Sequence, residues 1–109
     1  MTDALTTAWL AARLGEQPAR VDARRRAGQL VGVARADGQH VYPGWQFGRD
    51  GEPHPQLAAL VAAARAKGLD DRRLHELLTR RAGMLAGTRA ADAMRAGDSA
   101  PAFRAVAAA

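Results

Sequence analysis

Alanine is the residue that most restricts how this chain can fold. Of its 109 residues, 52 are hydrophobic, and 27 of those 52 are alanine, which leaves 25 larger apolar side chains to build a core. A core of that size suits one small domain, or two small modules that share apolar contacts, and it is marginal for a monomer. We therefore expect closely packed helices and a stabilising partner, most simply a second copy of the chain.

The charge of the chain is uneven along its length. Sixteen basic residues oppose eleven acidic ones, for a net charge of +5, and such an excess favours nucleic acids or anionic surfaces. Fifteen of the sixteen basic residues are arginine. Together with the alanine excess, this pattern is also what a G+C-rich genome produces, in which case the arginine excess has no functional meaning. Six arginines and two acidic residues lie between positions 13 and 35, so this stretch alone carries +4. Its location is more informative than the total.

The first third of the chain is predicted to form two short helices joined by a tight turn. Thr6 is placed to cap a helix over 7–14, and Gly15 is placed to end it. Pro18 then opens a second helix that runs to about Ala27. Two short helices with a glycine-containing turn between them are the helix-turn-helix arrangement.

A β-hairpin is predicted directly after these helices. Residues 29–35 are rich in β-branched and apolar side chains, Asp37-Gly38 is a strong hairpin turn signal, and 39–42 form the returning strand. A hairpin in this position is a wing. Such a hairpin must pack on something, because two strands alone are marginally stable.

Three aromatic side chains are expected to be buried, because the chain has so few large apolar groups. They are Trp9, Trp45 and Phe47. The alternative is that they stack on the bases of a single-stranded nucleic acid. A linker over 48–55 is predicted to follow, and then a helical second half. Its expected features are a helix over 56–67, a helix capped by Asp70, a loop over 80–87, a helix capped by Thr88, and a last helix starting at Asp98 or Ser99 with Pro101 in its first turn.

The second helix is the predicted DNA-reading element. Val21 marks its buried side, while small residues at positions 19, 23 and 27 would let its outer face approach a major groove about 12 Å wide. Arginine there can bind guanine or neutralise phosphate. The alternative is an ordinary solvated face, and Arg25 lies close enough to Val21 to cover the edge of the core instead. The candidate DNA-binding residues on this helix and the wing are Gln17, Arg20, Arg24, Arg25, Arg26, Arg35 and His40.

Several blocks of the sequence resemble a known family. Residues 7–30 resemble the winged helix-turn-helix of small bacterial regulators, and Tyr-Pro-Gly-Trp-Gln-Phe at 42–47 resembles a Tyr-Pro-Ala-Trp-Gln-Phe element that follows that module in one group. In that group the carboxyl-terminal half is similar to the toxin-binding domain of Xre/MbcA/ParS-type antitoxins. The blocks that match it are 77–79, Leu85, Gly87 and 92–98, while the stretches 81–83 and 86–91 depart from the family's loop motif.

The resemblance implies an antitoxin that represses its own operon and binds a toxin. In the family that toxin is commonly a RES-type protein that degrades NAD or transfers ADP-ribose. The residues that the resemblance implies for partner binding are Leu85, Gly87, Arg95, Asp98 and Phe103.

An enzyme is not expected from this sequence. His40, His54 and His75 are scattered and have no acidic partners at metal-ligand spacing, and the chain has no phosphate-loop or nucleophile-elbow pattern. The absence of cysteine excludes thiol catalysis and cysteine-based zinc sites. We expect no metal and no cofactor. The sequence contains neither a signal-peptide pattern nor an apolar run of about 18 residues, so we expect a cytoplasmic protein.

Together these features predict an α+β protein that is mostly α. A winged helix-turn-helix over 1–47 is joined by the linker over 48–55 to a helical dimerisation or toxin-binding-like domain over 56–109. The predicted function is sequence-specific binding of double-stranded DNA by a homodimeric transcriptional regulator of the antitoxin type. The alternatives are a protein–protein adaptor, or a DNA-binding regulator that has no toxin partner.

Overall fold

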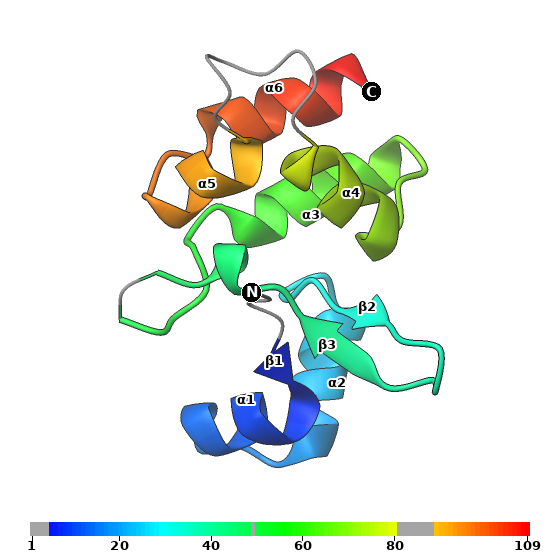
Figure 1. Ribbon diagram of the computed structural model, residues 1–109, viewed down its shortest axis with the longest axis vertical. Helices are drawn as coiled ribbons and strands as arrows, with labels where there is room; N and C mark the ends of the chain where they lie inside the picture. Colours follow the sequence, from blue (N-terminus) through cyan, green and yellow to red (C-terminus); the bar gives the residue numbers. More distant parts are fainter. Residues whose placement is uncertain (1–4, 49, 81–88) are drawn as a thin grey trace.

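The computed structural model describes residues 5–48, 50–80 and 89–109. Its described residues form an α+β fold in which helices predominate, as predicted (Figure 1). The elements in chain order are β1 (Leu5–Thr6), α1 (Thr7–Leu14), α2 (Pro18–Arg26), β2 (Val33–Ala34), β3 (His40–Tyr42), the 3-10 helix η1 (Gly44–Gln46), α3 (Leu57–Ala66), α4 (Asp71–Thr79), α5 (Ala90–Arg95) and α6 (Ala100–Ala108). Helices α1 and α2 and the sheet lie at one end of the molecule, and α3–α6 lie at the other.

Local signals placed the helix ends correctly. The side chain of Thr6 accepts a hydrogen bond from the Trp9 backbone N–H at 3.1 Å, so it caps α1 as predicted. Gly15 ends α1 with a φ of 67°, a left-handed conformation that glycine adopts without strain. Asp70 caps α4 in the same way as Thr6 caps α1, since its carboxylate accepts from the Arg73 N–H at 2.8 Å. The predicted loop over 80–87 and the predicted cap at Thr88 lie almost wholly outside the described residues.

The sheet differs from the predicted two-stranded wing. It has three antiparallel strands in the order β1-β3-β2, and Leu5 pairs with Tyr42 at its added edge. The Asp37-Gly38 turn forms as expected, with the Arg35 N–H donating to the Gln39 carbonyl at 2.7 Å. Strand β1 was missed because two residues are too short to show an alternating pattern.

The strand predicted over 29–35 is also shorter than expected, since only Val33–Ala34 belongs to the ladder. Leu30 and Val31 are fully buried but lie outside the sheet. Their burial explains the strand-like composition. The backbone of Val31 finds its hydrogen-bonding partner in a side chain instead of a neighbouring strand.

That partner is Gln46, a polar side chain with no exposed surface. Its amide oxygen accepts from the Val31 N–H at 2.8 Å, and its amide nitrogen donates to the Val31 carbonyl at 2.8 Å and to the Pro43 carbonyl at 3.0 Å. The amide therefore reproduces the pair of hydrogen bonds that an adjacent strand would offer. Every buried polar group involved is satisfied, which is the condition for burying an amide at low cost.

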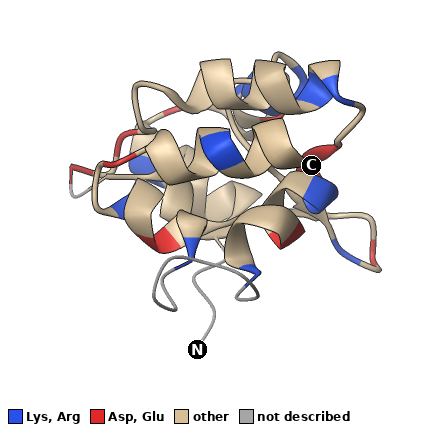
Figure 2. Ribbon diagram, turned by 90° about the horizontal axis from the view of Figure 1, so that it is seen from above, with Lys and Arg blue, Asp and Glu red and all other residues tan. Residues whose placement is uncertain are grey.

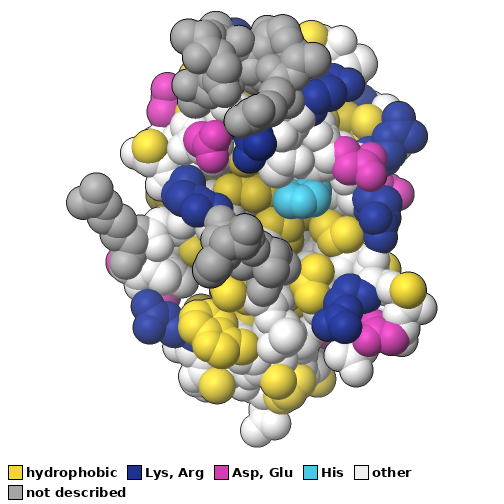
Figure 3. Space-filling model, viewed as in Figure 1, with side chains coloured by type: hydrophobic (Ala, Val, Ile, Leu, Met, Phe, Trp, Pro, Cys, Tyr) yellow, Lys and Arg dark blue, Asp and Glu magenta, His cyan; other side chains and the backbone are white. Residues whose placement is uncertain are grey.

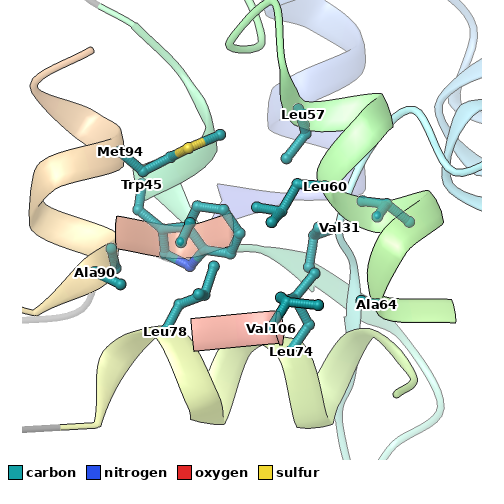
Figure 4. Packing of buried hydrophobic residues seen from close by; sticks show 13 residues of the cluster. Val31, Trp45, Leu57, Leu60, Ala64, Leu74, Leu78, Ala90, Met94 and Val106 are labelled. Carbon is teal, nitrogen blue, oxygen red and sulfur yellow. The ribbon is translucent and has the colours of Figure 1, made fainter. Parts of the chain in front are cut away.

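Two hydrophobic clusters meet at this amide. The smaller one joins α1, α2 and the sheet, and its buried members are Leu10, Ala11, Val21, Leu30, Tyr42 and Phe47. The larger one fills the space between α3, α4, α5 and α6, and it also includes Val31 and Trp45 from the first half of the chain. In Figure 4 the indole of Trp45 lies among Met94, Leu78 and Leu60. Neighbouring residues thus enter different clusters on either side of Gln46.

Trp45 and Phe47 are buried as expected, but the expectation for Trp9 is wrong. Trp9 is 52% exposed, whereas Leu10 and Ala11 face the smaller cluster. Successive helix residues are about 100° apart, so the helix that buries Leu10 and Ala11 turns Trp9 toward solvent.

The buried amide gives a direct test of this architecture. Gln46→Ala should lower the free energy of unfolding by about 2 to 5 kcal/mol, because it leaves the N–H and C=O of Val31 buried without partners. The matched control is Gln29→Ala, at an exposed position, which should change stability by about 0.5 kcal/mol or less. Urea unfolding followed by circular dichroism measures both. Equal stabilities of the two variants would contradict the role given to Gln46.

Candidate nucleic-acid interface

The outer face of α2 is lined with small side chains. Ala19, Ala23 and Ala27 are all exposed there, while Val21 on the opposite side is completely buried. The helix begins with Pro18 at its first position and spans nine residues. Among the described residues, alanine forms the centre of this face, so the wall of a groove wide enough for a helix can come close to the α2 backbone.

Arginine side chains flank this alanine face on both sides. Arg20 is exposed and forms no ion pair with any residue that the structure describes. Arg26 is 63% exposed, and its guanidinium lies 3.8 Å from the Asp22 carboxylate, at the outer limit of an ion pair. Solvent-exposed pairs of this kind contribute little energy, so the Arg26 guanidinium can readily exchange partners.

Two other arginines of α2 are engaged in the fold. The Arg24 guanidinium lies 2.5 Å from the Glu16 carboxylate, and only 32% of its side chain is exposed. Arg25 is more deeply buried, with its aliphatic stem against the backbone of Gly32, where there is no room for a Cβ atom. Arg25 thus covers the edge of the core, which is the alternative that the sequence suggested for it.

The wing places further polar groups beside α2. Arg35, half exposed, lies 3.4 Å from the Asp37 carboxylate at the hairpin turn. His40 is half-buried at the start of β3, and its carbonyl accepts from the Thr7 hydroxyl at 3.5 Å. A cleft of about 290 Å³ separates the wing from the first turns of α2, with Ala19 on one wall and Gly38 on the other.

Gln17 is exposed just before the first turn of α2, and its side chain makes no capping hydrogen bond. The structure therefore brings Gln17, Arg20 and Arg26 to the open side of α2 and sets Arg35 and His40 on the wing. Arg24 and Arg25, by contrast, point into contacts within the protein. Positive charge is not confined to this region, since basic residues are spread over several helices, with acidic residues also scattered over the molecule (Figure 2).

The second half of the chain holds the carboxyl-terminal end of α2. The Arg65 guanidinium on α3 donates to the carbonyl of Arg26 at 3.2 Å and to that of Arg25 at 3.1 Å. These carbonyls lie at the negative end of the helix dipole, where a cation is favourable. The Asp71 carboxylate accepts from the Gly32 N–H at 3.1 Å and lies 3.7 Å from Arg65.

A further hydrogen bond connects the helical half to the wing: the Arg72 guanidinium on α4 donates to the Ala34 carbonyl at 2.5 Å. The residues joined by these hydrogen bonds are about 40 positions apart in the chain. Sequence reasoning missed Arg65, Asp71 and Arg72 for that reason, since no local pattern marks a contact of such range. They position α2 and β2 for whatever the outer face binds.

The residues implied for partner binding have mixed placements. Leu85 and Gly87 lie outside the described residues. Arg95 is exposed at the end of α5, Phe103 packs half-buried against the larger cluster, and the Asp98 carboxylate accepts from the Ala100 N–H at 3.1 Å at the start of α6. Asp98 and Phe103 thus have contacts within the fold.

A histidine–tryptophan pair lies where the wing meets the second half. The Trp45 indole N–H donates to Nδ1 of His75 at 3.0 Å, and the two rings are nearly parallel at 9° with centroids 6.4 Å apart. Burial lowers the pKa of His75 because it penalises the charged ring; the nearby Glu76 opposes this effect and Arg72 adds to it. Because Nδ1 accepts a hydrogen bond, the neutral ring carries its proton on Nε2.

Neither a metal-ligand cluster nor a membrane-spanning helix occurs among the described residues. Among the described residues, no three His, Asp or Glu side chains come together as metal ligands could. None of the described helices has the length and apolar character needed to cross a membrane.

Comparison with known proteins supports the fold. No family model matches this chain, and no curated protein matches it. The structure is similar to that of Rv2175c solved by NMR, with a TM-score of 0.83 and 25% sequence identity over 96% of this chain and 79% of that chain. This similarity confirms the small α+β fold, which is compatible with a winged helix. The resemblance to Xre/MbcA/ParS-type antitoxins stays a prediction.

The His75 pair predicts a pH dependence of stability. The folded protein binds a proton at His75 more weakly than the unfolded chain does, so acidification favours unfolding. Stability should begin to fall as the pH drops through about 6.5, the unfolded value, and should go on falling until the pH reaches the lower folded pKa.

His75→Asn is the matched variant, because its amide oxygen can accept from the Trp45 indole but does not titrate. The free energy of unfolding lost between about pH 7.5 and about pH 5 should be larger for the parent protein than for this variant. All other titratable groups are common to both proteins, so the difference isolates His75. The same loss in both would contradict the burial of a neutral imidazole.

Proposed function

We propose that the protein binds double-stranded DNA by inserting the outer face of α2 into the major groove. The observation that carries this proposal is the exposed alanine face of α2, with arginine on both sides and the wing next to it. An α-helix is about 10 to 12 Å across with its side chains, and the major groove is about 12 Å wide. Alanine at the centre of the face lets the helix enter without displacing large groups.

The arginines have distinct roles in this proposal. Arg20 and Arg26 reach base edges or phosphates from the two sides of the alanine face. Arg35 on the wing contacts the phosphate backbone or the minor groove, where arginine is favoured. Arg24 first has to leave Glu16, so its contribution is smaller than its position on the helix suggests.

The mechanism is binding and not chemistry, and its biological setting is transcriptional regulation. Neutralising phosphates releases counterions, so affinity should fall steeply with salt concentration. Binding of the promoter of its own operon would fit the autorepressor that the family resemblance implies. The ties from Arg65, Asp71 and Arg72 keep α2 and the wing in one arrangement, which reduces the entropy lost on binding.

Removing a single arginine tests the assignment. Arg20→Ala should weaken binding to a fluorescent duplex from the protein's own promoter by about tenfold or more, and it should reduce the slope of log affinity against log salt by about one. Arg104→Ala is the matched control, because Arg104 is exposed on α6 at the opposite end of the molecule. Fluorescence anisotropy at two salt concentrations measures both.

The double variant Arg20→Ala/Arg26→Ala strips both sides of the alanine face and should bind more weakly than either single variant. If the double variant bound the duplex as tightly as Arg104→Ala does, α2 would not be the DNA-reading helix. If the parent protein bound no duplex at low salt, the adaptor alternative would replace the DNA-binding proposal.

A homodimer formed through the carboxyl-terminal helices is the second part of the proposal. Ala58, Ala59, Ala62 and Ala66 are exposed along α3, and small side chains allow close helix approach. A two-fold dimer would place two copies of α2 on successive turns of the major groove, about 34 Å apart. Size-exclusion chromatography coupled to light scattering tests the proposed dimer. A monomeric mass at micromolar concentration would contradict it.

Toxin binding is a narrower proposal that rests on the family resemblance alone. Of the residues implied for it, Arg95 is exposed at the end of α5, and Asp98 and Phe103 also have contacts within the fold. Co-purification with the product of the neighbouring reading frame would support it. Failure of that pair to associate would leave a DNA-binding regulator without a toxin partner.

A further inference from the structure

A pocket of about 240 Å³ lies between the wing sheet and helices α4 and α5. In Figure 3 hydrophobic surface is visible between the two halves of the molecule, next to a histidine and with basic side chains around it. The volume is slightly below the range of about 300 to 1,000 Å³ that is usual for ligand pockets. It therefore suits a metabolite smaller than a typical drug.

The walls of the pocket are largely apolar on the sheet side. Val33 and Val41 are paired across β2 and β3, and both are only half-buried and line the pocket. Pro43 and the indole of Trp45 continue this surface. A flat apolar group would cover the exposed parts of Val33 and Val41, and burial of apolar surface is favourable by about 25 cal/mol per Å².

A hydrogen-bond donor lies on the helix side. The Trp45 indole N–H fixes the orientation of the His75 ring through Nδ1, which leaves the proton on Nε2. That Nε2 proton has no hydrogen-bond partner among the described residues. His75 lines the pocket, so a ligand acceptor could take this bond.

The polar edge of the pocket carries a net positive charge. Arg89 and Arg95 line it together with one acid, Asp92. Arg89 is half-buried and forms no ion pair with a described residue. Guanidinium groups bind carboxylates by charge-assisted hydrogen bonds, which are stronger than bonds between neutral groups.

We propose that this pocket binds a small organic carboxylate with a flat apolar body. The carboxylate lies against Arg89 and the Nε2–H of His75, and the apolar body lies against Val33, Val41 and Trp45. None of these residues belongs to the proposed DNA-binding face.

The position of the pocket also makes it a means of regulation, and this part rests on the proposed DNA binding. Val33 and Val41 belong to the two strands that carry the wing tip, whereas His75 and Arg89 belong to the helical half. A bound ligand would contact both parts at once. By thermodynamic linkage, DNA affinity then changes by the difference between the ligand's affinities for the DNA-bound and the free protein.

The two tryptophans allow binding to be measured without DNA. In a ¹H–¹⁵N spectrum of the full chain, the two indole N–H signals are assigned with the variant Trp9→Phe. Phenylacetate and benzoate are the probes, and phenylacetamide and benzamide are their neutral counterparts. The acids should shift the Trp45 signal saturably and leave that of Trp9, which is exposed on α1, unchanged. The amides should bind at least about tenfold more weakly.

Arg89→Gln should weaken the binding of the acids by at least about tenfold, while Arg104→Gln should leave it unchanged. The backbone amide signals of the same spectra show whether each variant is folded, and Arg95→Gln provides a second test if Arg89→Gln unfolds. Absence of a saturable Trp45 shift with both acids would overturn the site. Equal binding of acids and amides, or a wild-type affinity in both arginine variants, would overturn its selectivity for carboxylates.

The regulatory part has a separate readout. Saturating phenylacetate should change the affinity for duplex DNA in the parent protein, and the change should be lost in Arg89→Gln. A saturable Trp45 shift with an unchanged DNA affinity would overturn the coupling but keep the site. Failure of the parent protein to bind any duplex would remove the DNA-binding proposal and leave the carboxylate site standing on its own spectrum.

Discussion

The side-chain amide of Gln46 occupies the place that a neighbouring β-strand would otherwise take beside Val31. It satisfies both backbone groups of Val31 in the interior, where an unpaired group would cost about 1 to 3 kcal/mol. This bond fixes the chain at the point where Trp45 enters one cluster and Phe47 the other. The chain has only 25 large apolar side chains, and they fill two small clusters. The hydrogen bonds of Gln46 hold these two clusters together.

The candidate interface depends on these hydrogen bonds of Gln46. With the two clusters fixed, Arg65 reaches the end of α2, Asp71 reaches Gly32 and Arg72 reaches Ala34. The helical half thereby positions both α2 and the wing. Val33 and Val41 of the same wing sheet line the proposed carboxylate pocket, so events in the helical half have a physical route to the proposed DNA-binding face.

Helix caps and stops, which depend on neighbouring residues, could be predicted from the sequence, whereas contacts between distant segments could not. The caps at Thr6 and Asp70 and the stop at Gly15 each depend on neighbouring residues, and all three form as predicted. Strand β1, the bonds between Gln46 and Val31, and the ties from Arg65 join distant segments, which a single sequence does not reveal. The exposed alanine face of α2 was predictable from helical periodicity, whereas the Arg24–Glu16 pair across the helical turn was not.

Titration of labelled protein with a promoter duplex at low salt shows whether the outer face of α2 contacts duplex DNA. We expect the backbone amide signals of Ala19, Ala23 and Ala27 to shift together with that of Gly38 at the wing tip. Signals from α6, at the opposite end of the molecule, should stay in place. Shifts confined to α3–α6, or no shift in α2 at saturating duplex, would contradict the account.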